Sequence, residues 1–168
     1  MVLVAALAMG CARSPAEPTA PPEPAAAAEQ VEQAEPSPEA QIDDLERRYG
    51  EAMSQRERLE PLAPELSAFV SANPDNASGW LIYSQVLLEL EDVDGSMEAA
   101  ERCVAVDSST AGCWLTIGLL REIAGEREQA IGPYERYLEL APEGRYVQEV
   151  QKALKRVRPE SPEPTPRQ

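Results

Sequence analysis

The residue types that most often perform chemistry are sparse in this chain. It contains no histidine, which is the commonest general base and metal ligand in proteins. The carboxylates of Glu91, Asp92 and Asp94 have a spacing that can hold calcium, but the twelve-residue loop and its closing bidentate glutamate are missing. No glycine-rich phosphate loop, CxxC pair or serine nucleophile elbow occurs. We therefore interpret the acidic run as a solvated turn, and we predict no catalytic residue, no metal site, no cofactor and no enzyme activity.

Two cysteines, Cys103 and Cys113, lie near the end of one predicted helix and in the first turn of the next. They could therefore be neighbours, and in an exported protein they could form a disulfide. The alternative is a pair of small buried side chains, because free cysteine often packs in that way. Neither is predicted to be a catalytic thiol, since no histidine or basic cluster is placed to lower its pKa.

The formal charge of the chain is −15. Such a chain repels nucleic acid, whose binding depends on lysine and arginine, and long-range attraction favours basic partners. Proline, alanine and glutamate dominate residues 12–40, and proline is frequent again in residues 158–168. Neither segment has enough large apolar side chains to offset the entropy of ordering, so both are predicted to be disordered. The remaining residues, 41–157, form one predicted helical domain.

The first eleven residues resemble the end of a secretory signal, because an apolar run from Val2 to Met9 precedes a small residue and a cysteine. The run is too short to span a bilayer, which needs about 20 residues. The stretch from Leu7 to Cys11 resembles the lipobox of bacterial lipoproteins. That resemblance implies lipid attachment at Cys11 and a place at the cell envelope, and Ala12 after the cysteine favours the outer membrane facing the periplasm. If residues 1–11 are not a signal, the same domain would be cytoplasmic.

An internal repeat runs through the predicted helical domain. The interval between the two tryptophans, Trp80 and Trp114, also separates Pro74 from Ser108 and Ser108 from Pro142. With residues 77–110 aligned on residues 111–144, large apolar side chains pair with large ones and small with small. The pairs include Tyr83 with Ile117, Ser84 with Gly118, and Ser96 with Ala130. A fixed period of about 34 residues indicates stacked helical hairpins.

The second unit, with Trp114, Gly118, Gly125, Ala130 and the stretch from Tyr134 to Pro142, resembles the tetratricopeptide repeat (TPR). That resemblance implies an all-α solenoid of about three antiparallel helical hairpins. Apolar residues at 147, 150, 154 and 157 predict a capping helix after the last hairpin. In the first unit the candidate turn glycine is Gly95, which lies four residues after the position equivalent to Gly125. Pro133 lies inside a predicted helix, where it should remove a hydrogen bond and bend the axis.

In the TPR family, the first helix of each repeat lines a concave groove that binds peptides or proteins. The resemblance therefore implies a protein-binding adaptor or scaffold, one that assists assembly of a larger complex. The groove should be apolar with an acidic edge, and it lacks the basic and amide positions that clamp a terminal carboxylate. We expect an apolar or basic protein segment as the partner. The alternative is that the protein covers its own groove, either with the cap helix or with a second copy. A second copy would make the protein a self-associating structural subunit, a homo-oligomer with no external peptide ligand. The implied groove positions are Ser78, Leu81, Gln85, Leu88, Glu89, Gly112, Leu115, Leu119, Glu122 and Ile123.

Overall fold

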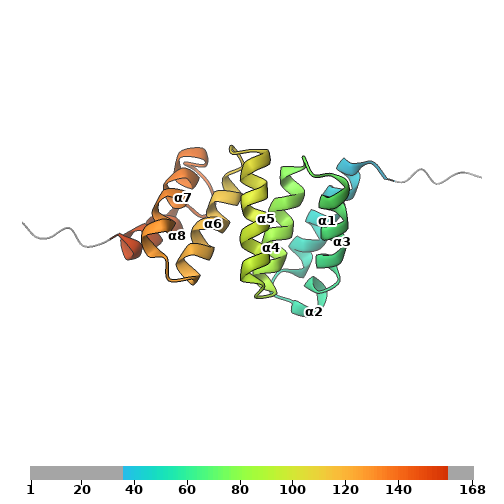
Figure 1. Ribbon diagram of the computed structural model, residues 1–168, viewed down its shortest axis with the longest axis horizontal. Helices are drawn as coiled ribbons and strands as arrows, with labels where there is room; N and C mark the ends of the chain where they lie inside the picture. The colour runs from blue at the N-terminus through green and yellow to red at the C-terminus, as the bar shows by residue number, and fades with distance from the viewer. Residues whose placement is uncertain (1–35, 159–168) are drawn as a thin grey trace, which may run out of the picture. The chain divides into compact units, whose positions relative to one another are not determined.

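The computed structural model describes residues 36–158 of the chain. The signal-like segment at 1–11, most of the predicted linker and the tail beyond Arg158 lie outside those residues. The described part is helical and contains no strand, so the predicted all-α fold class is confirmed (Figure 1). Its helices are α1 (Pro38–Ala52), α2 (Arg56–Leu59), α3 (Leu62–Ala72), α4 (Ala77–Glu89), α5 (Val93–Val106), α6 (Ala111–Ile123), α7 (Arg127–Leu140) and α8 (Val147–Val157).

The first helix begins at Pro38, shortly before the predicted domain boundary at Gln41. The side chain of Ser37 caps this helix, because its hydroxyl accepts a hydrogen bond of 3.3 Å from the backbone N–H of Ala40. Pro38 occupies the first helical position, where its fixed φ and missing N–H carry no penalty. These local signals extend α1 into a segment whose overall composition predicts disorder.

Antiparallel hairpins form the repeating unit, with α4 packed on α5 and α6 packed on α7 (Figure 1). Small residues allow each pair to approach closely. In the first pair Ser96 donates a buried hydrogen bond of 2.7 Å from its hydroxyl to the carbonyl oxygen of Ser84. In the second, a Cβ atom on Gly118 would lie 2.5 Å from the ring of Tyr134. The two helices of each hairpin therefore approach closely at the repeat positions that the sequence fills with small residues.

The same hydrogen bond occurs at both tryptophans, one repeat period apart. The indole N–H of Trp80 donates to the carbonyl oxygen of Pro74 over 2.8 Å, and that of Trp114 donates to the carbonyl oxygen of Ser108 over 2.8 Å. Each bond joins the first turn of a hairpin to the loop before it. The repeat in the sequence is therefore matched by a repeat of the same hydrogen bond in the structure.

The turns inside the two hairpins also match in backbone conformation. Gly125 has a φ of +78°, and Glu91, which lies one repeat period earlier, has a φ of +67°. The late Gly95 is therefore not the turn glycine. It lies in the first turn of α5, where its N–H donates to the side chain of Asp92 over 3.0 Å and completes the N-cap of that helix.

Helix α7 continues through Pro133 from Arg127 to Leu140. A proline disfavours the helical conformation of the residue before it, because its Cδ clashes with that residue's Cβ. Here the preceding residue is Gly132, which has no Cβ. Gly132 thus relieves part of the clash with the preceding residue, whereas the missing N–H and the clash of the ring with the carbonyl one turn earlier remain.

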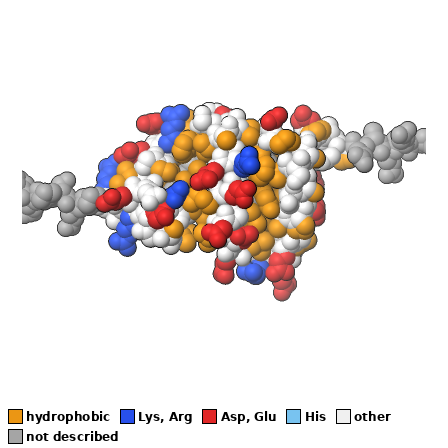
Figure 2. All heavy atoms as spheres, in the orientation of Figure 1, with side chains coloured by type: hydrophobic (Ala, Val, Ile, Leu, Met, Phe, Trp, Pro, Cys, Tyr) orange, Lys and Arg blue, Asp and Glu red, His pale blue; other side chains and the backbone are white. Residues whose placement is uncertain are grey.

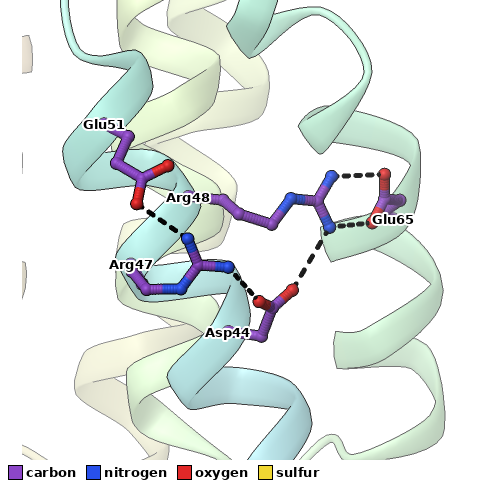
Figure 3. A network of polar contacts seen from close by, with 5 residues as sticks. All are labelled: Asp44, Arg47, Arg48, Glu51 and Glu65. Atoms are coloured by element: carbon purple, nitrogen blue, oxygen red, sulfur yellow. Dashed lines mark hydrogen bonds and ion pairs between the residues drawn. The ribbon is translucent and has the colours of Figure 1, made fainter.

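The N-terminal hairpin is joined by a polar network on its surface as well as by its core. Arg48 on α1 donates two hydrogen bonds, of 2.6 and 2.8 Å, to the carboxylate of Glu65 on α3. Figure 3 shows that Asp44 lies between Arg48 and Arg47, and that Glu51 binds Arg47 on the next turn of α1. A bidentate arginine–carboxylate pair fixes orientation more strictly than a single contact. It therefore holds α1 in a defined position against α3.

The buried apolar side chains of residues 36–158 divide into clusters along the stack. One joins α1 to α4 and contains Leu45, Leu66, Phe69 and Val86, among others. Another joins α6 and α7 to α8, whose buried side chains are Val150, Ala153, Leu154 and Val157. A smaller cluster of Ala100, Ile117 and Leu120 lies between them. Each helix thus packs mainly on its neighbours in the chain, as in other helical repeats.

Acidic side chains gather over the part of the surface where Figure 1 places α5, with hydrophobic atoms on both sides of them (Figure 2). Asp94, Glu98 and Glu101 are the exposed acidic residues of that helix. Within residues 36–158, no helix is long and apolar enough to cross a membrane.

Candidate functional site

A hollow of about 490 Å³ lies between the first helices of the hairpins and α8. We call it the groove. Helices α1, α4 and α6 supply one part of its lining, and α7 and α8 supply the rest. The lining residues are Tyr49, Met53, Gln85, Leu88, Glu89, Leu115, Thr116, Leu119, Tyr134, Tyr146, Glu149, Val150, Lys152, Ala153 and Arg156.

Five of the positions that the resemblance implied line the groove, namely Gln85, Leu88, Glu89, Leu115 and Leu119. They come from the later turns of α4 and from the middle of α6. Leu119 keeps 39% of its surface exposed, and Met53, the residue after α1, keeps 38%. A cavity with exposed apolar side chains and a few polar groups is the usual form of a binding site.

The other implied positions are placed differently. Leu81 packs against Gly112, where a Cβ atom would lie 3.0 Å from its side chain. Ser78 lies in the first turn of α4, and Ile123 is 58% exposed at the end of α6, outside the lining. Glu122 does not line the hollow either, but its carboxylate is bound to two side chains that do, those of Tyr134 and Arg156.

The carboxylate of Glu122 connects three helices. It accepts hydrogen bonds from the guanidinium of Arg156 on α8, at 2.9 and 3.2 Å, and from the hydroxyl of Tyr134 on α7, at 2.9 Å. Partial burial raises the pKa of Glu122, but these bonds outweigh it and hold the pKa below its usual value. Burial and the bond to Glu122 raise the pKa of Tyr134. Glu122, part of the acidic edge expected from the sequence, is thus neutralised by Arg156 of α8.

Tyr49, Glu89 and Tyr146 also line the groove. Burial, followed by the negative charge of Glu89, raises the pKa of Tyr49 to about 12. Tyr146 at the start of α8 carries the guanidinium of Arg145 over its ring, 4.9 Å from the centroid. Residues from α1, α4 and the start of α8 therefore come within electrostatic reach of each other.

Helix α8, which the sequence predicts as a cap that could cover the groove leucines, supplies a wall of the groove. The signal for it was present, because Tyr146, Glu149, Ala153 and Arg156 lie one repeat period after Gly112, Leu115, Leu119 and Glu122. Extending the repeat register by one more unit would have found them. Tyr49 and Met53 do not follow that register, since the N-terminal hairpin contains the additional short helix α2.

Cys103 on α5 and Cys113 on α6 form a disulfide in the structure, with their Cα atoms 6.1 Å apart. Both side chains are fully buried. The bond joins the second helix of one hairpin to the first helix of the next. It lies away from the groove lining, so it supports the scaffold and takes no part in the groove surface.

Residues 36–158 contain no group of three or more histidine, cysteine, aspartate or glutamate side chains placed to hold a metal ion. The groove offers apolar surface, phenol groups, a threonine hydroxyl, an amide and charged side chains of both signs. Such a set can bind and orient a ligand by shape and charge.

Comparison with solved structures is informative about the fold. The TPR domain of Arabidopsis OM64 superimposes with a TM-score of 0.60 at 17% identity, covering 70% of this chain and 93% of that chain. The Sgt2 TPR domain from Aspergillus fumigatus gives 0.61 at 21% identity, covering 73% and 78%. This chain has the fold of a TPR domain.

A third TPR structure has a ligand. The second TPR domain of human RPAP3, in complex with an HSP70 peptide, gives a TM-score of 0.60 at 16% identity, covering 71% of this chain and 97% of that chain. No protein-family model matches the sequence, and no curated protein matches it. At these identities the likeness of the TPR structures establishes the shared architecture alone.

Proposed function

We propose that this protein is an adaptor that binds a segment of another protein in the groove and so assists assembly of a larger complex. The observation that carries the proposal is the exposed apolar surface of Met53 and Leu119 inside a concave hollow. Apolar side chains that remain exposed in a cavity mark binding sites more often than isolated ones on a convex surface. The solved complex of an RPAP3 domain of the same fold with a peptide is consistent with this use.

The test compares two arginine substitutions at apolar residues of similar exposure. Leu119 lines the groove and is 39% exposed, whereas Val106 at the end of α5 is 37% exposed and lies outside it. We expect Leu119→Arg to abolish capture of a partner from detergent-solubilised membranes, because a charge would replace an apolar contact. Val106→Arg should capture the partner like wild type. Circular dichroism must first show that both variants are folded.

Two outcomes would count against the adaptor. Equal capture by both variants would place the binding surface elsewhere. If wild type captured no partner but its mass in solution rose with concentration, and Leu119→Arg stopped that rise, the groove would be filled by a second copy. The self-associating structural subunit would then be the better description.

We further propose that the chain is anchored by a lipid on Cys11 at the bacterial envelope, with its helical domain in the periplasm. Two features support this localisation. The stretch from Leu7 to Cys11 resembles a lipobox. The bond between Cys103 and Cys113 fits an oxidising compartment, because disulfides are rare in cytosolic proteins. Mass spectrometry of the membrane fraction should find a diacylglyceryl group on Cys11, and Cys11→Ser should release the protein from membranes. An unmodified Cys11 on a chain that retains residues 1–10 would refute the anchor.

A further inference from the structure

A smaller hollow, of about 180 Å³, lies between α3, α4 and α5 and shares no lining residue with the groove. We call it the aromatic hollow. Helix α4 supplies two aromatic rings, those of Trp80 and Tyr83, and α5 supplies the carboxylate of Glu98. The other lining residues are small or aliphatic, namely Ser67, Val70, Ser71, Gly95 and Ala99. The hollow thus combines two aromatic rings with one charged group, which is an acid.

The two rings are held in a defined arrangement. Their centroids are 6.4 Å apart and their planes are tilted by 48°. Both rings are half-buried against the core of the N-terminal helices, and the indole N–H of Trp80 is bound to the carbonyl oxygen of Pro74. A cation within about 6 Å of an aromatic centroid is attracted by the negative face of the ring. The exposed parts of Trp80 and Tyr83 therefore offer a preformed surface for a cation.

The charges around the aromatic hollow also favour a cation. Glu98 is exposed and has no ion-pair partner among residues 36–158. Within about one helical turn of the lining residues along the chain, the one base is Arg102, which forms no ion pair in the described part of the chain. Two acids in that range, Glu65 and Glu101, are paired with arginines. The acids there without an ion pair among residues 36–158 are Asp75, Glu91, Asp92 and Asp94. The local potential is therefore negative.

The next repeat unit shows which of these residues the fold requires. One period after Tyr83 the chain has Ile117, and one period after Glu98 it has Gly132. The hairpin of α6 and α7 forms with those residues. Packing of a hairpin therefore requires neither the phenol ring of Tyr83 nor the carboxylate of Glu98, and both groups are available to a ligand.

We propose that the aromatic hollow binds the guanidinium or ammonium group of a basic side chain on a partner protein. The cation lies against the rings of Trp80 and Tyr83, and Glu98 balances its charge. Arginine and lysine suit such a lining because their apolar stems pack on apolar surface while the charged group stays partly in water. This site goes beyond the adaptor function proposed for the groove, because it lies on a different surface of the domain.

The experiment titrates the full chain, labelled with nitrogen-15, with capped tripeptides in which arginine, lysine or citrulline lies between two glycines. Citrulline has the shape of arginine without its charge. The chain has two tryptophans, so its proton–nitrogen spectrum contains one indole signal from Trp80 and one from Trp114, which lies outside the hollow. The signal of Trp114 is identified by its loss in Trp114→Phe and serves as an internal reference. The titration is done at low ionic strength, because salt screens exposed charges.

We expect the arginine and lysine peptides to shift the Trp80 signal in a saturable manner and to leave the Trp114 signal in place. The citrulline peptide should bind about three- to thirtyfold more weakly than the arginine peptide, as expected when a cation–π contact and an exposed ion pair are lost together. Tyr83→Ile, which introduces the residue of the next repeat, and Glu98→Gln should each weaken binding of the arginine peptide about two- to fivefold. The matched control is Asp94→Asn on the preceding turn of α5, outside the lining, which should change the affinity less than about twofold.

Several results would overturn the site. Equal affinity for the arginine and citrulline peptides would show that charge is not recognised. Equal shifts of both indole signals, or no shift of the Trp80 signal, would show that the hollow binds no cation. Unchanged affinity in both Tyr83→Ile and Glu98→Gln would place the cation elsewhere.

The groove variant separates this inference from the adaptor proposal. Leu119→Arg should bind the arginine peptide like wild type, because Leu119 does not line the aromatic hollow. Loss of binding in that variant would mean that the peptide occupies the groove, and the proposed cation site would then be wrong while a ligand-binding groove would stand. Unchanged binding in Leu119→Arg supports the aromatic hollow whether or not the groove captures a partner.

Discussion

Gly118 offers the sharpest test of how the hairpins pack. Its substitution by alanine adds one methyl group between α6 and α7. That methyl would lie 2.5 Å from both Cδ1 and Cε1 of Tyr134. Tyr134 cannot easily move away, because it is fully buried and its hydroxyl is held by Glu122 over 2.9 Å.

The magnitude follows from two opposing effects. Overpacking a well-packed core by a methyl group costs typically about 1–3 kcal/mol, the range we expect at this contact. Alanine is more favourable than glycine inside a helix by roughly 0.5–1 kcal/mol. We therefore expect Gly118→Ala to lower the free energy of unfolding by about 1–2 kcal/mol, and to lower Tm by roughly 4–8 °C.

The assay is urea unfolding followed by far-ultraviolet circular dichroism, with Gly50→Ala as the matched control. Gly50 lies inside α1, and a Cβ atom there would meet nothing within 4 Å. Its substitution should raise the free energy of unfolding by roughly 0.5–1 kcal/mol, since only the helix preference acts. The packing argument is refuted if Gly118→Ala is as stable as wild type, or if both substitutions change stability in the same direction.

Three further predictions concern the scaffold. Reducing the bond between Cys103 and Cys113, whose sequence separation is 10, should cost roughly 2–3 kcal/mol through the loop entropy of the unfolded chain; an unchanged urea midpoint in dithiothreitol would mean that the bond does not form. The pKa of Glu122 is lower in the folded state than in the unfolded state. The ionised carboxylate therefore stabilises the fold at a pH above its unfolded-state pKa, and this stabilisation is lost as the pH falls through its folded-state pKa. Glu122→Gln should thus be less stable than wild type at neutral pH, but should lose less stability than wild type as the pH falls through the range in which carboxylates titrate. Equal losses of unfolding free energy in the two proteins, measured with urea, would contradict this. Glu91→Gly should raise the free energy of unfolding by up to about 1 kcal/mol, because Glu91 has a φ of +67° that glycine adopts without strain; a lower urea midpoint would contradict it.

Much of the fold could be predicted because its determinants are local and periodic. Trp80 and Trp114 occupy equivalent positions and make the same hydrogen bond, so the interval between them indicates the hairpin unit directly. The small residues at Ser84 and Gly118 mark the close approach of paired helices. The start of α1 was missed because composition was averaged over a segment, whereas Ser37 and Pro38 act as single residues.

The groove was harder to predict because it depends on how the stack curves. The side chains of α6 and α8 that face the groove follow from the repeat register, but how closely α8 approaches the other helices depends on angles between successive hairpins. Those angles are set by side-chain packing across several interfaces, and no period encodes them. The contact between Arg156 and Glu122, which changes the charge of the groove edge, depends on how closely α8 approaches α6.

The disulfide between α5 and α6 also determines how the chain can carry tension. If the chain is anchored at Cys11 and loaded through a ligand in the groove, as proposed above, it is pulled along its backbone. The disulfide closes a loop of the residues between Cys103 and Cys113, and the Cα atoms of these two cysteines are 6.1 Å apart. At roughly 3.3–3.6 Å per extended residue, the loop withholds about 30 Å of contour length until the bond is reduced. Force therefore passes from α5 to α6 through the sulfur atoms, and the connection between these helices stays slack.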